Sequence, residues 1–179
     1  MSEADLWVFG YGSLLWNPGF EHVETALAQL PAYARSFCMS SIHHRGSEEK
    51  PGLVLALDEQ AGASCNGLAF KVAPGTHEVT MEVLRERELI SSAYLEKNLE
   101  IALDDGRVVT AVTYVIDPDH VQYVGGLSLE DQARIIAHAH GGKGPNRDYL
   151  YNTAEHLAEL GIEDEELSWL AREVRAICS

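Results

Sequence analysis

Two glycines interrupt an apolar segment near the start of the chain, in the run Val8-Phe9-Gly10-Tyr11-Gly12-Ser13-Leu14-Leu15-Trp16. Glycine permits backbone angles that a side chain forbids, and it lets main-chain N–H groups approach a small molecule closely. Successive amides in such a turn form a concavity that binds anions. A tight structural turn after a buried strand is the alternative, and the third glycine and the acidic residue of a dinucleotide fingerprint are missing. The run alone therefore predicts a turn, and a ligand only if other residues support it.

Glu88 is the second candidate for chemistry, because it lies in line with apolar residues on a predicted helix. The segment Thr76–Ser91 has no proline or internal glycine and is rich in Glu, Arg, Leu and Met, which favours a helix. Met81 and Leu84 share the face of Glu88. A carboxyl in that position is either exposed at the helix end or buried, and a buried one needs a partner or a proton. The helix pattern alone favours the exposed position in so acidic a chain.

Further short motifs follow the glycine turn along the chain. They are Trp16-Asn17-Pro18-Gly19-Phe20, His44-Arg45-Gly46, Lys50-Pro51-Gly52, Arg87-Glu88 with Tyr94 behind it, and Asn146-x-x-Tyr149-Leu150. In this order and spacing they resemble the ChaC family of γ-glutamylcyclotransferases, over nearly the whole chain. The chain departs from the family at Arg35-Ser36, where paired arginines are frequent, and at Leu89-Ile90-Ser91-Ser92, where some members have glycines.

The resemblance implies an enzyme that cleaves glutathione to 5-oxoproline and cysteinylglycine without a cofactor. In that reaction the α-amine of the substrate attacks its own γ-carbonyl, so the protein needs no serine or cysteine nucleophile. Glu88 would accept the amine proton as general base and later deliver one to the departing amine, a role typically worth about 10²–10⁴ in rate. The match at Arg87-Glu88 thus favours a functional Glu88 over a solvated one.

The resemblance also implies which residues hold the substrate. Amides of the glycine turn would bind either the negative charge that grows on the carbonyl oxygen or the substrate's α-carboxylate. Tyr149 would offer a hydroxyl, although it could instead only pack its ring. Arg45 could pair with a substrate carboxylate or could pin a loop. The predicted substrate-binding residues are Tyr11, Gly12, Ser13, Leu14, Arg45 and Tyr149.

Two other functions fit the same residues. The chemistry reads only the glutamyl half of the substrate, so other γ-glutamyl amines or amino acids are alternative substrates. A non-catalytic binding or regulatory domain would keep the pocket without the reaction. A metal site is not predicted, because His43-His44 and His138-x-His140 lack the ligands that accompany zinc. Cys38 has no evident basic partner and is not predicted to be a nucleophile.

Bulk composition limits the class of protein. The 179 residues carry a formal net charge of −15, which repels nucleic acid and anionic lipid at long range, so neither is an expected partner. An anionic small-molecule substrate then requires a local positive pocket. Three cysteines without a Cys-x-x-Cys pair suit a reducing compartment. The N-terminus resembles neither a signal peptide nor a membrane span, and a cytoplasmic location is expected.

Strands come first along the chain and helices last, which predicts one α+β domain over residues 1–179. Asp104-Asp105-Gly106 predicts a hairpin turn, Ser128 with Asp131 a helix cap, and Asn146 a second cap. The resemblance adds that the sheet curls into a small mixed β-barrel with flanking helices. The predicted strands are Leu6–Phe9, Ala32–Met39, Leu53–Leu57, Gly67–Val72, Leu99–Leu103 and Val108–Ile116, and the later helices carry Leu150–Leu160 and Leu167–Ile177.

Overall fold

The computed structural model describes residues 5–89 and 93–179. The chain forms two compact units, and each is assembled from two separate stretches. The first unit is Met1–Arg35 with Leu57–His120, and the second is Ser36–Ala56 with Val121–Ser179. The single domain over residues 1–179 stays a prediction. None of the helices in the described ranges is long and apolar enough to cross a membrane.

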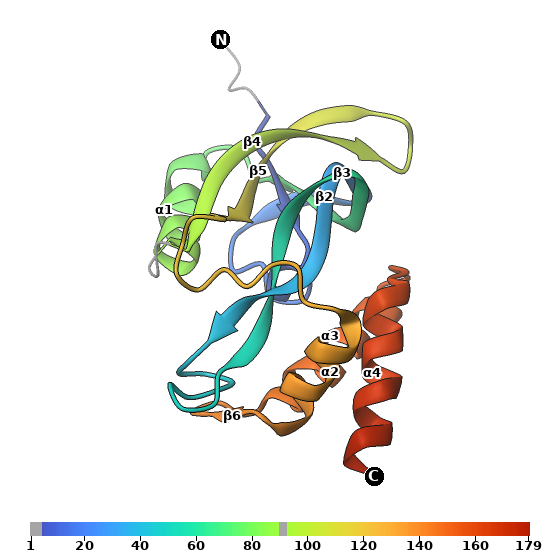
Figure 1. Ribbon diagram of the computed structural model, residues 1–179. Coiled ribbons are helices and arrows are strands. Elements are labelled where there is room, and N and C mark those ends of the chain that lie inside the picture. The colour runs from blue at the N-terminus through green and yellow to red at the C-terminus, as the bar shows by residue number, and fades with distance from the viewer. Residues whose placement is uncertain (1–4, 90–92) are drawn as a thin grey trace. The chain divides into compact units, whose positions relative to one another are not determined.

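Five strands close into a barrel in the order β1-β3-β2-β4-β5 (Figure 1). Strand β1 runs antiparallel to β3 and parallel to β5, so the barrel is mixed, as expected. Strand β2 begins in the first unit and ends in the second, and β3 begins in the second and ends in the first. The predicted α+β fold with a small mixed barrel is confirmed. The strands are β1 (Trp7–Gly10), β2 (His22–Ser41), β3 (Gly52–Val72), β4 (Tyr94–Leu103) and β5 (Val108–Ile116).

The hairpin between β4 and β5 forms as the sequence predicts. Gly106 has a φ of +94°, a left-handed conformation that glycine adopts without a steric penalty. Its N–H donates to the Leu103 carbonyl at 3.0 Å. The register then pairs Ala102 with Val108.

Strand β3 differs from the prediction of two short strands, Leu53–Leu57 and Gly67–Val72. The residues between them, from Asp58 to Asn66, are mostly polar or small and mostly exposed, and this composition favours a break in the pattern. The structure instead continues one strand through them beside β2. Backbone pairing along a long neighbouring strand outweighs a weak local preference.

Helix α1 (His77–Glu88) lies where the sequence predicts a helix. Its apolar face is anchored by Leu84, which is fully buried, while Glu82, Arg85 and Glu86 are exposed. Leu84 joins a core cluster with side chains from β1, β3, β5 and the turn after β1, namely Val8, Leu14, Val72, Val112 and Tyr114. Burial of one such leucine stabilises the fold by about 1.5–3 kcal/mol. The predicted helix end at Ser91 lies outside the described residues.

The second unit contains helices α2 (Leu129–His138), α3 (Asn146–Glu159) and α4 (Glu165–Cys178), which pack on one another (Figure 1). Ser128 caps α2 by accepting a hydrogen bond from the Asp131 N–H, as predicted. The predicted cap at Asn146 is wrong, because α3 begins at Asn146 and its N-cap is Pro145. The Asn146 side chain is instead buried and hydrogen-bonded to the backbone of Leu53.

A short two-stranded ribbon, β6 (His140–Gly141) with β7 (Gly144–Pro145), occupies the loop before α3.

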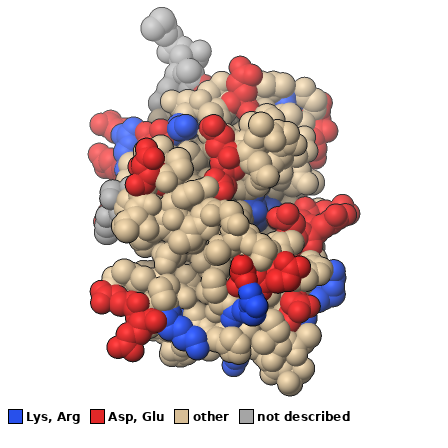
Figure 2. Space-filling view, viewed as in Figure 1, with Lys and Arg blue, Asp and Glu red and all other residues tan. Residues whose placement is uncertain are grey.

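Acidic side chains are spread over the face that Figure 2 shows, with basic ones between them. The negative charge of the chain is therefore distributed on that face rather than gathered into one patch.

Candidate active site

The glycine turn after β1 is a single 3-10 turn, Ser13–Leu15. The Leu15 N–H donates to the Gly12 carbonyl at 2.9 Å and closes the turn. Tyr11 and Leu14 are buried, whereas Ser13 is exposed. Of these side chains, Ser13 alone is therefore presented to solvent, and Leu14 anchors the turn in the core cluster.

Gly10 and Gly12 of the turn differ in the space that a side chain would have. A Cβ on Gly10 would lie 3.1 Å from the Leu14 Cβ and 3.2 Å from a ring carbon of Phe70, so close packing disfavours a side chain there. A Cβ on Gly12 would meet no described atom within 4 Å. Packing within the described residues therefore does not explain Gly12, and open space above a turn backbone is what the close approach of a ligand requires.

Glu88 is the last residue of α1 and continues the line of Met81 and Leu84 along the apolar face. Its side chain is 16% exposed. Burial raises the pKa of the Glu88 carboxyl above its ordinary value, and the neighbouring Arg87 guanidinium lowers it by a smaller amount. A carboxyl with a raised pKa is a stronger base and a more effective proton carrier near neutral pH.

Arg87 connects this carboxyl to the glycine turn. Its Nη2 donates to the Ser13 Oγ at 2.7 Å, and its Nη1 donates to the Asn17 carbonyl at 2.6 Å. Its Nε lies 3.6 Å from a carboxylate oxygen of Glu88. The turn and Glu88 therefore belong to one unit and one set of contacts. Sequence reasoning assigned no role to Arg87, although the Arg87-Glu88 motif drew attention to the position.

Arg35 on β2 holds the other end of the turn. It is 7% exposed, and its Nε donates to the Tyr11 carbonyl at 2.8 Å. Its Nη2 donates to the Asn66 carbonyl. A buried guanidinium requires such acceptors. One of them here is the carbonyl of Tyr11, the residue at the start of the glycine turn. The sequence left the role of Arg35 open, because the acceptor is a backbone atom far away along the chain.

Tyr114 on β5 is a further buried polar group of the same unit. Its hydroxyl donates to Glu96 Oε1 at 2.8 Å, and Glu96 also receives two hydrogen bonds from Arg85, at 3.0 and 3.1 Å. Burial, together with Glu96, raises the pKa of Tyr114, and the charge of Glu88 adds to the effect. Tyr114 therefore stays a neutral hydroxyl within the electrostatic range of Glu88. Sequence analysis assigned no role to Tyr114.

Arg45 and Tyr149 come together in the second unit. The Arg45 Nη1 donates to the carbonyls of Lys143 and Pro145, at 3.0 and 3.3 Å. Its guanidinium carbon lies 5.8 Å from the centre of the Tyr149 ring, a cation–π arrangement. The Tyr149 hydroxyl accepts a hydrogen bond from the Leu55 N–H. Arg45 thus pins a loop, one of the two roles that the sequence left open, and substrate contacts of both residues stay predictions.

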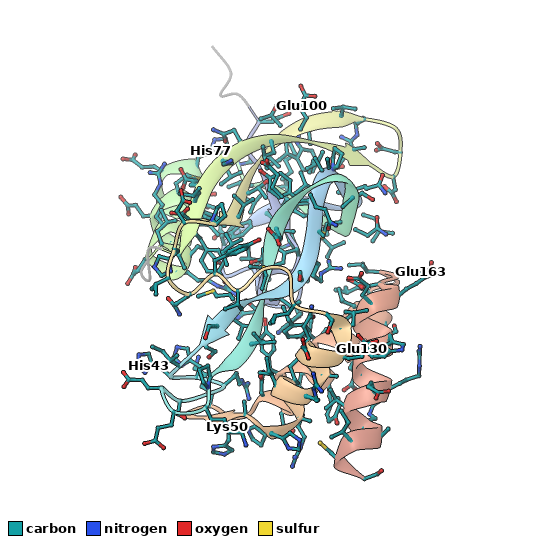
Figure 3. All side chains as sticks on the ribbon, viewed as in Figure 1. His43, Lys50, His77, Glu100, Glu130 and Glu163 are labelled. Atoms are coloured by element: carbon teal, nitrogen blue, oxygen red, sulfur yellow. The ribbon has the colours of Figure 1, made fainter. Side chains whose placement is uncertain are left out.

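The histidine pairs of the sequence do not assemble a metal site in the described residues. Figure 3 shows His43 on the loop that follows β2, with Lys50 on the same loop. Residues 5–89 and 93–179 contain no cluster of three or more His, Cys, Asp or Glu that could hold a metal ion. The metal-free and cofactor-free reaction stays a prediction.

Known proteins of one family match nearly the whole chain. A family model described as ChaC-like protein matches residues 6–177. The glutathione-specific gamma-glutamylcyclotransferase of Escherichia coli (strain K12) is 36% identical over 175 residues, which cover 98% of this chain and 75% of that protein. Gamma-glutamylcyclotransferase 2-1 of Arabidopsis thaliana is 38% identical over 177 residues, covering 95% and 82%.

Solved structures show the same fold. The crystal structure of a yeast gamma-glutamyl cyclotransferase specific to glutathione matches with a TM-score of 0.83 at 23% identity, covering 98% of this chain and 100% of that chain. The resemblance that the motifs predict is confirmed by the family model and by both relatives. On this basis the chain belongs to the ChaC-like family.

Proposed function

We propose that this protein is a γ-glutamylcyclotransferase that cleaves glutathione to 5-oxoproline and cysteinylglycine, with Glu88 as its general acid and base. The relatives named above support the reaction. The observation that carries the assignment of residues is the contact set of Arg87, which joins the glycine turn to the half-buried Glu88 carboxyl.

The reaction begins with proton removal. The α-amine of glutathione has a pKa near that of other α-amines, about 8, and is mostly protonated at neutral pH. Glu88, whose pKa burial raises, accepts this proton. The free amine then attacks the γ-carbonyl and closes a five-membered lactam. Such intramolecular attack reaches effective molarities of about 10⁵ M or more when the chain is held folded, so no enzyme nucleophile is needed.

The second half of the reaction returns the proton. As the C–N bond to cysteinylglycine breaks, the departing amine takes a proton from Glu88 and the carboxylate is regenerated. The new ring nitrogen releases its second proton to solvent, which leaves the neutral lactam. Amides of the turn at Tyr11, Gly12, Ser13 and Leu14 hold either the developing oxyanion or the α-carboxylate in this proposal. The exposed Ser13 hydroxyl is the side chain of the turn that contributes to this binding.

The experiment is a direct assay of the product. Purified protein is incubated with glutathione, and 5-oxoproline and cysteinylglycine are measured by mass spectrometry. Glu88→Gln keeps the shape but not the basicity, and we expect a loss of at least about 10² in kcat with substrate binding retained. Glu86→Gln, on the exposed side of the same helix, is the matched control. Wild-type protein that forms no 5-oxoproline contradicts the proposal.

A cyclotransferase for other γ-glutamyl amines is the second candidate. One observation favours it. The α-amine and the γ-carbonyl that react both belong to the glutamyl half of the substrate, and the proposed roles of the turn and Glu88 concern these groups alone. Assays with glutathione and with γ-glutamyl-alanine distinguish the two candidate enzymes. Comparable kcat/KM values for these two substrates would support the enzyme of broader specificity. Wild-type protein that binds glutathione in calorimetry but never converts it is instead the result that a binding or regulatory domain predicts.

We place the enzyme in the cytoplasm. The sequence has three cysteines, an odd number, without a Cys-x-x-Cys pair, a pattern that suits a reducing compartment better than a disulfide framework. The net charge of −15 argues against nucleic acid as a partner. Fractionation of cells that express a tagged full-length chain tests this location.

A further inference from the structure

We propose that Arg87 is a positioning residue of this site, which orients the Ser13 hydroxyl toward the substrate and holds the glycine turn at a fixed place beside Glu88. The inference rests on the proposed function and adds a residue to its machinery. Arg87 reaches the substrate through Ser13 and the turn, not by reacting itself.

The guanidinium of Arg87 makes two hydrogen bonds to the segment that follows β1. Nη1 and Nη2 bind two separate points of the same turn, the Asn17 carbonyl at 2.6 Å and the Ser13 Oγ at 2.7 Å. A Cβ on Gly19 would lie 3.5 Å from Nη1, so the guanidinium lies beside Gly19 as well. The guanidinium is planar and its donors have a fixed spacing. Two acceptors held by one such group are therefore held at a fixed separation.

Arg87 also fixes the direction in which the Ser13 hydroxyl proton points. A serine hydroxyl donates one hydrogen bond and accepts up to two. The Ser13 oxygen already accepts from Arg87, so its proton points away from the guanidinium. Ser13 is exposed, and its proton is therefore available to an acceptor on a bound ligand. Arg87 in this way makes Ser13 a hydrogen-bond donor toward an oxygen atom of the ligand. The α-carboxylate and the γ-carbonyl of a glutamyl group both offer such an oxygen.

Arg87 also lies close to Glu88 without a hydrogen bond from its Nε to the carboxylate. The Nε lies 3.6 Å from the Glu88 carboxylate, beyond hydrogen-bond distance, and burial still dominates the pKa of Glu88. Arg85, three residues before Glu88, is instead engaged with Glu96 through two hydrogen bonds. The two arginines of the helix thus differ in what they hold, and Arg85 provides a matched control.

The experiment is a double-mutant cycle between Ser13 and Arg87, read as kcat and KM for glutathione. We expect Arg87→Gln to lower kcat/KM by about 10–10² and Ser13→Ala by about tenfold. Combined, the two substitutions should lose no more than Arg87→Gln alone, because Ser13 contributes only when Arg87 orients it. Arg87→Lys should recover part of the loss, since an ammonium reaches one acceptor but not both. Arg85→Gln should stay within about twofold of wild type.

Two results overturn the proposal. One is an Arg87→Gln enzyme with unchanged kcat/KM, and the other is a double variant in which the two separate losses multiply. A purely structural brace would lower the melting temperature without coupling Ser13 to Arg87. Should Arg87→Gln unfold at the assay temperature, the cycle of Ser13→Ala with Arg87→Lys decides by the same rule. Wild-type protein without 5-oxoproline would instead contradict the proposed function, so the two failures are distinct.

Discussion

The Arg35 Nε donates a hydrogen bond of 2.8 Å to the Tyr11 carbonyl. Strand β2 of the barrel therefore holds the first residue of the glycine turn. Arg87 holds Ser13 and Asn17 further along the same turn. The turn is thus held at both ends by guanidinium groups from two different elements. Such a frame keeps backbone amides in place before a substrate arrives, which is the condition for effective electrostatic stabilisation.

Arg35→Met should lower both stability and activity. The substitution keeps much of the side-chain volume but leaves the Tyr11 and Asn66 carbonyls without this donor. An unsatisfied buried acceptor costs about 1–3 kcal/mol, and urea denaturation measures the loss. Arg134→Met, at a side chain that is 68% exposed, is the control and should change stability by less than about 0.5 kcal/mol. Equal stability of the two variants would show that the Arg35 contacts contribute nothing.

Glu88→Gln should make the protein more stable near neutral pH. Burial raises the folded-state pKa of Glu88 above the value in the unfolded chain. The stabilising contribution of such a group is complete below the unfolded pKa and is lost as pH rises through the folded pKa. The charged group that acts on Glu88 is Arg87 on α1, which opposes the shift. Glutamine removes the cost of ionising the group.

Melting temperatures of wild type and Glu88→Gln across the pH range test this expectation. The variant should melt higher near neutral pH, and the difference should disappear as pH falls below the ordinary glutamate pKa, about 4.3. Glu86→Gln, at an exposed position, should show no such trend. A Glu88→Gln protein that is less stable than wild type near neutral pH would contradict the assignment of burial as the dominant effect.

The acid limb of the pH–rate profile should move when Arg87 loses its charge. Arg87 lowers the pKa of Glu88, so Arg87→Gln raises that pKa further, and deprotonation of the general base then requires a higher pH. We expect the acid limb of kcat/KM to shift upward in Arg87→Gln and to stay in place in Arg85→Gln. An unshifted limb in the first variant would remove Glu88 or Arg87 from this role.

Leu84→Ala should destabilise the first unit strongly. Leu84 is fully buried in the cluster that also contains Leu14 of the turn. Truncation of a leucine at such a position costs about 2–5 kcal/mol, measurable by urea denaturation. Val79→Ala on the same helix, where the side chain is 55% exposed, should cost less than about 0.5 kcal/mol. Similar losses in both variants would contradict the described packing of α1.

Asn146→Asp should destabilise the second unit, increasingly so as the new carboxyl ionises. The Asn146 amide donates to the Leu53 carbonyl and accepts from the Leu53 N–H, each at 2.8 Å, and the residue is fully buried. An aspartate can only accept, so its charge would face that carbonyl. The loss should reach several kcal/mol. Asn152→Asp, exposed on the same helix, is the control, and equal thermal stability of the two would contradict the contact.

Features with local signals were predictable from the sequence. The turn at Gly10–Gly12, the hairpin at Gly106, the Ser128 cap and the helix before Glu88 all depend on residues close together in the chain. The barrel came from resemblance to a family, because no periodicity specifies how strands close. The first unit also brings the predicted turn and Glu88 into one contact set.

Features that depend on distant partners were not predictable in the same way. Asn146 looked like a helix cap, but its amide is used by Leu53, far away in sequence. Arg87 binds Ser13 across 74 residues of the chain, and Arg35 binds Tyr11 across 24. A hydrogen bond between two such residues leaves no spacing or composition signal, since its geometry exists only after the chain has folded.

The division of both units into separated stretches has a consequence for synthesis. Ser36–Ala56 leaves the ribosome long before Val121–Ser179, the stretch that completes its unit. Contacts between segments so far apart in the sequence raise the entropic cost of closing the loop between them, and this slows folding. A nascent chain must therefore carry that early segment without the later stretch while residues 57–120 are synthesised, and chaperone engagement is expected to concentrate in this interval.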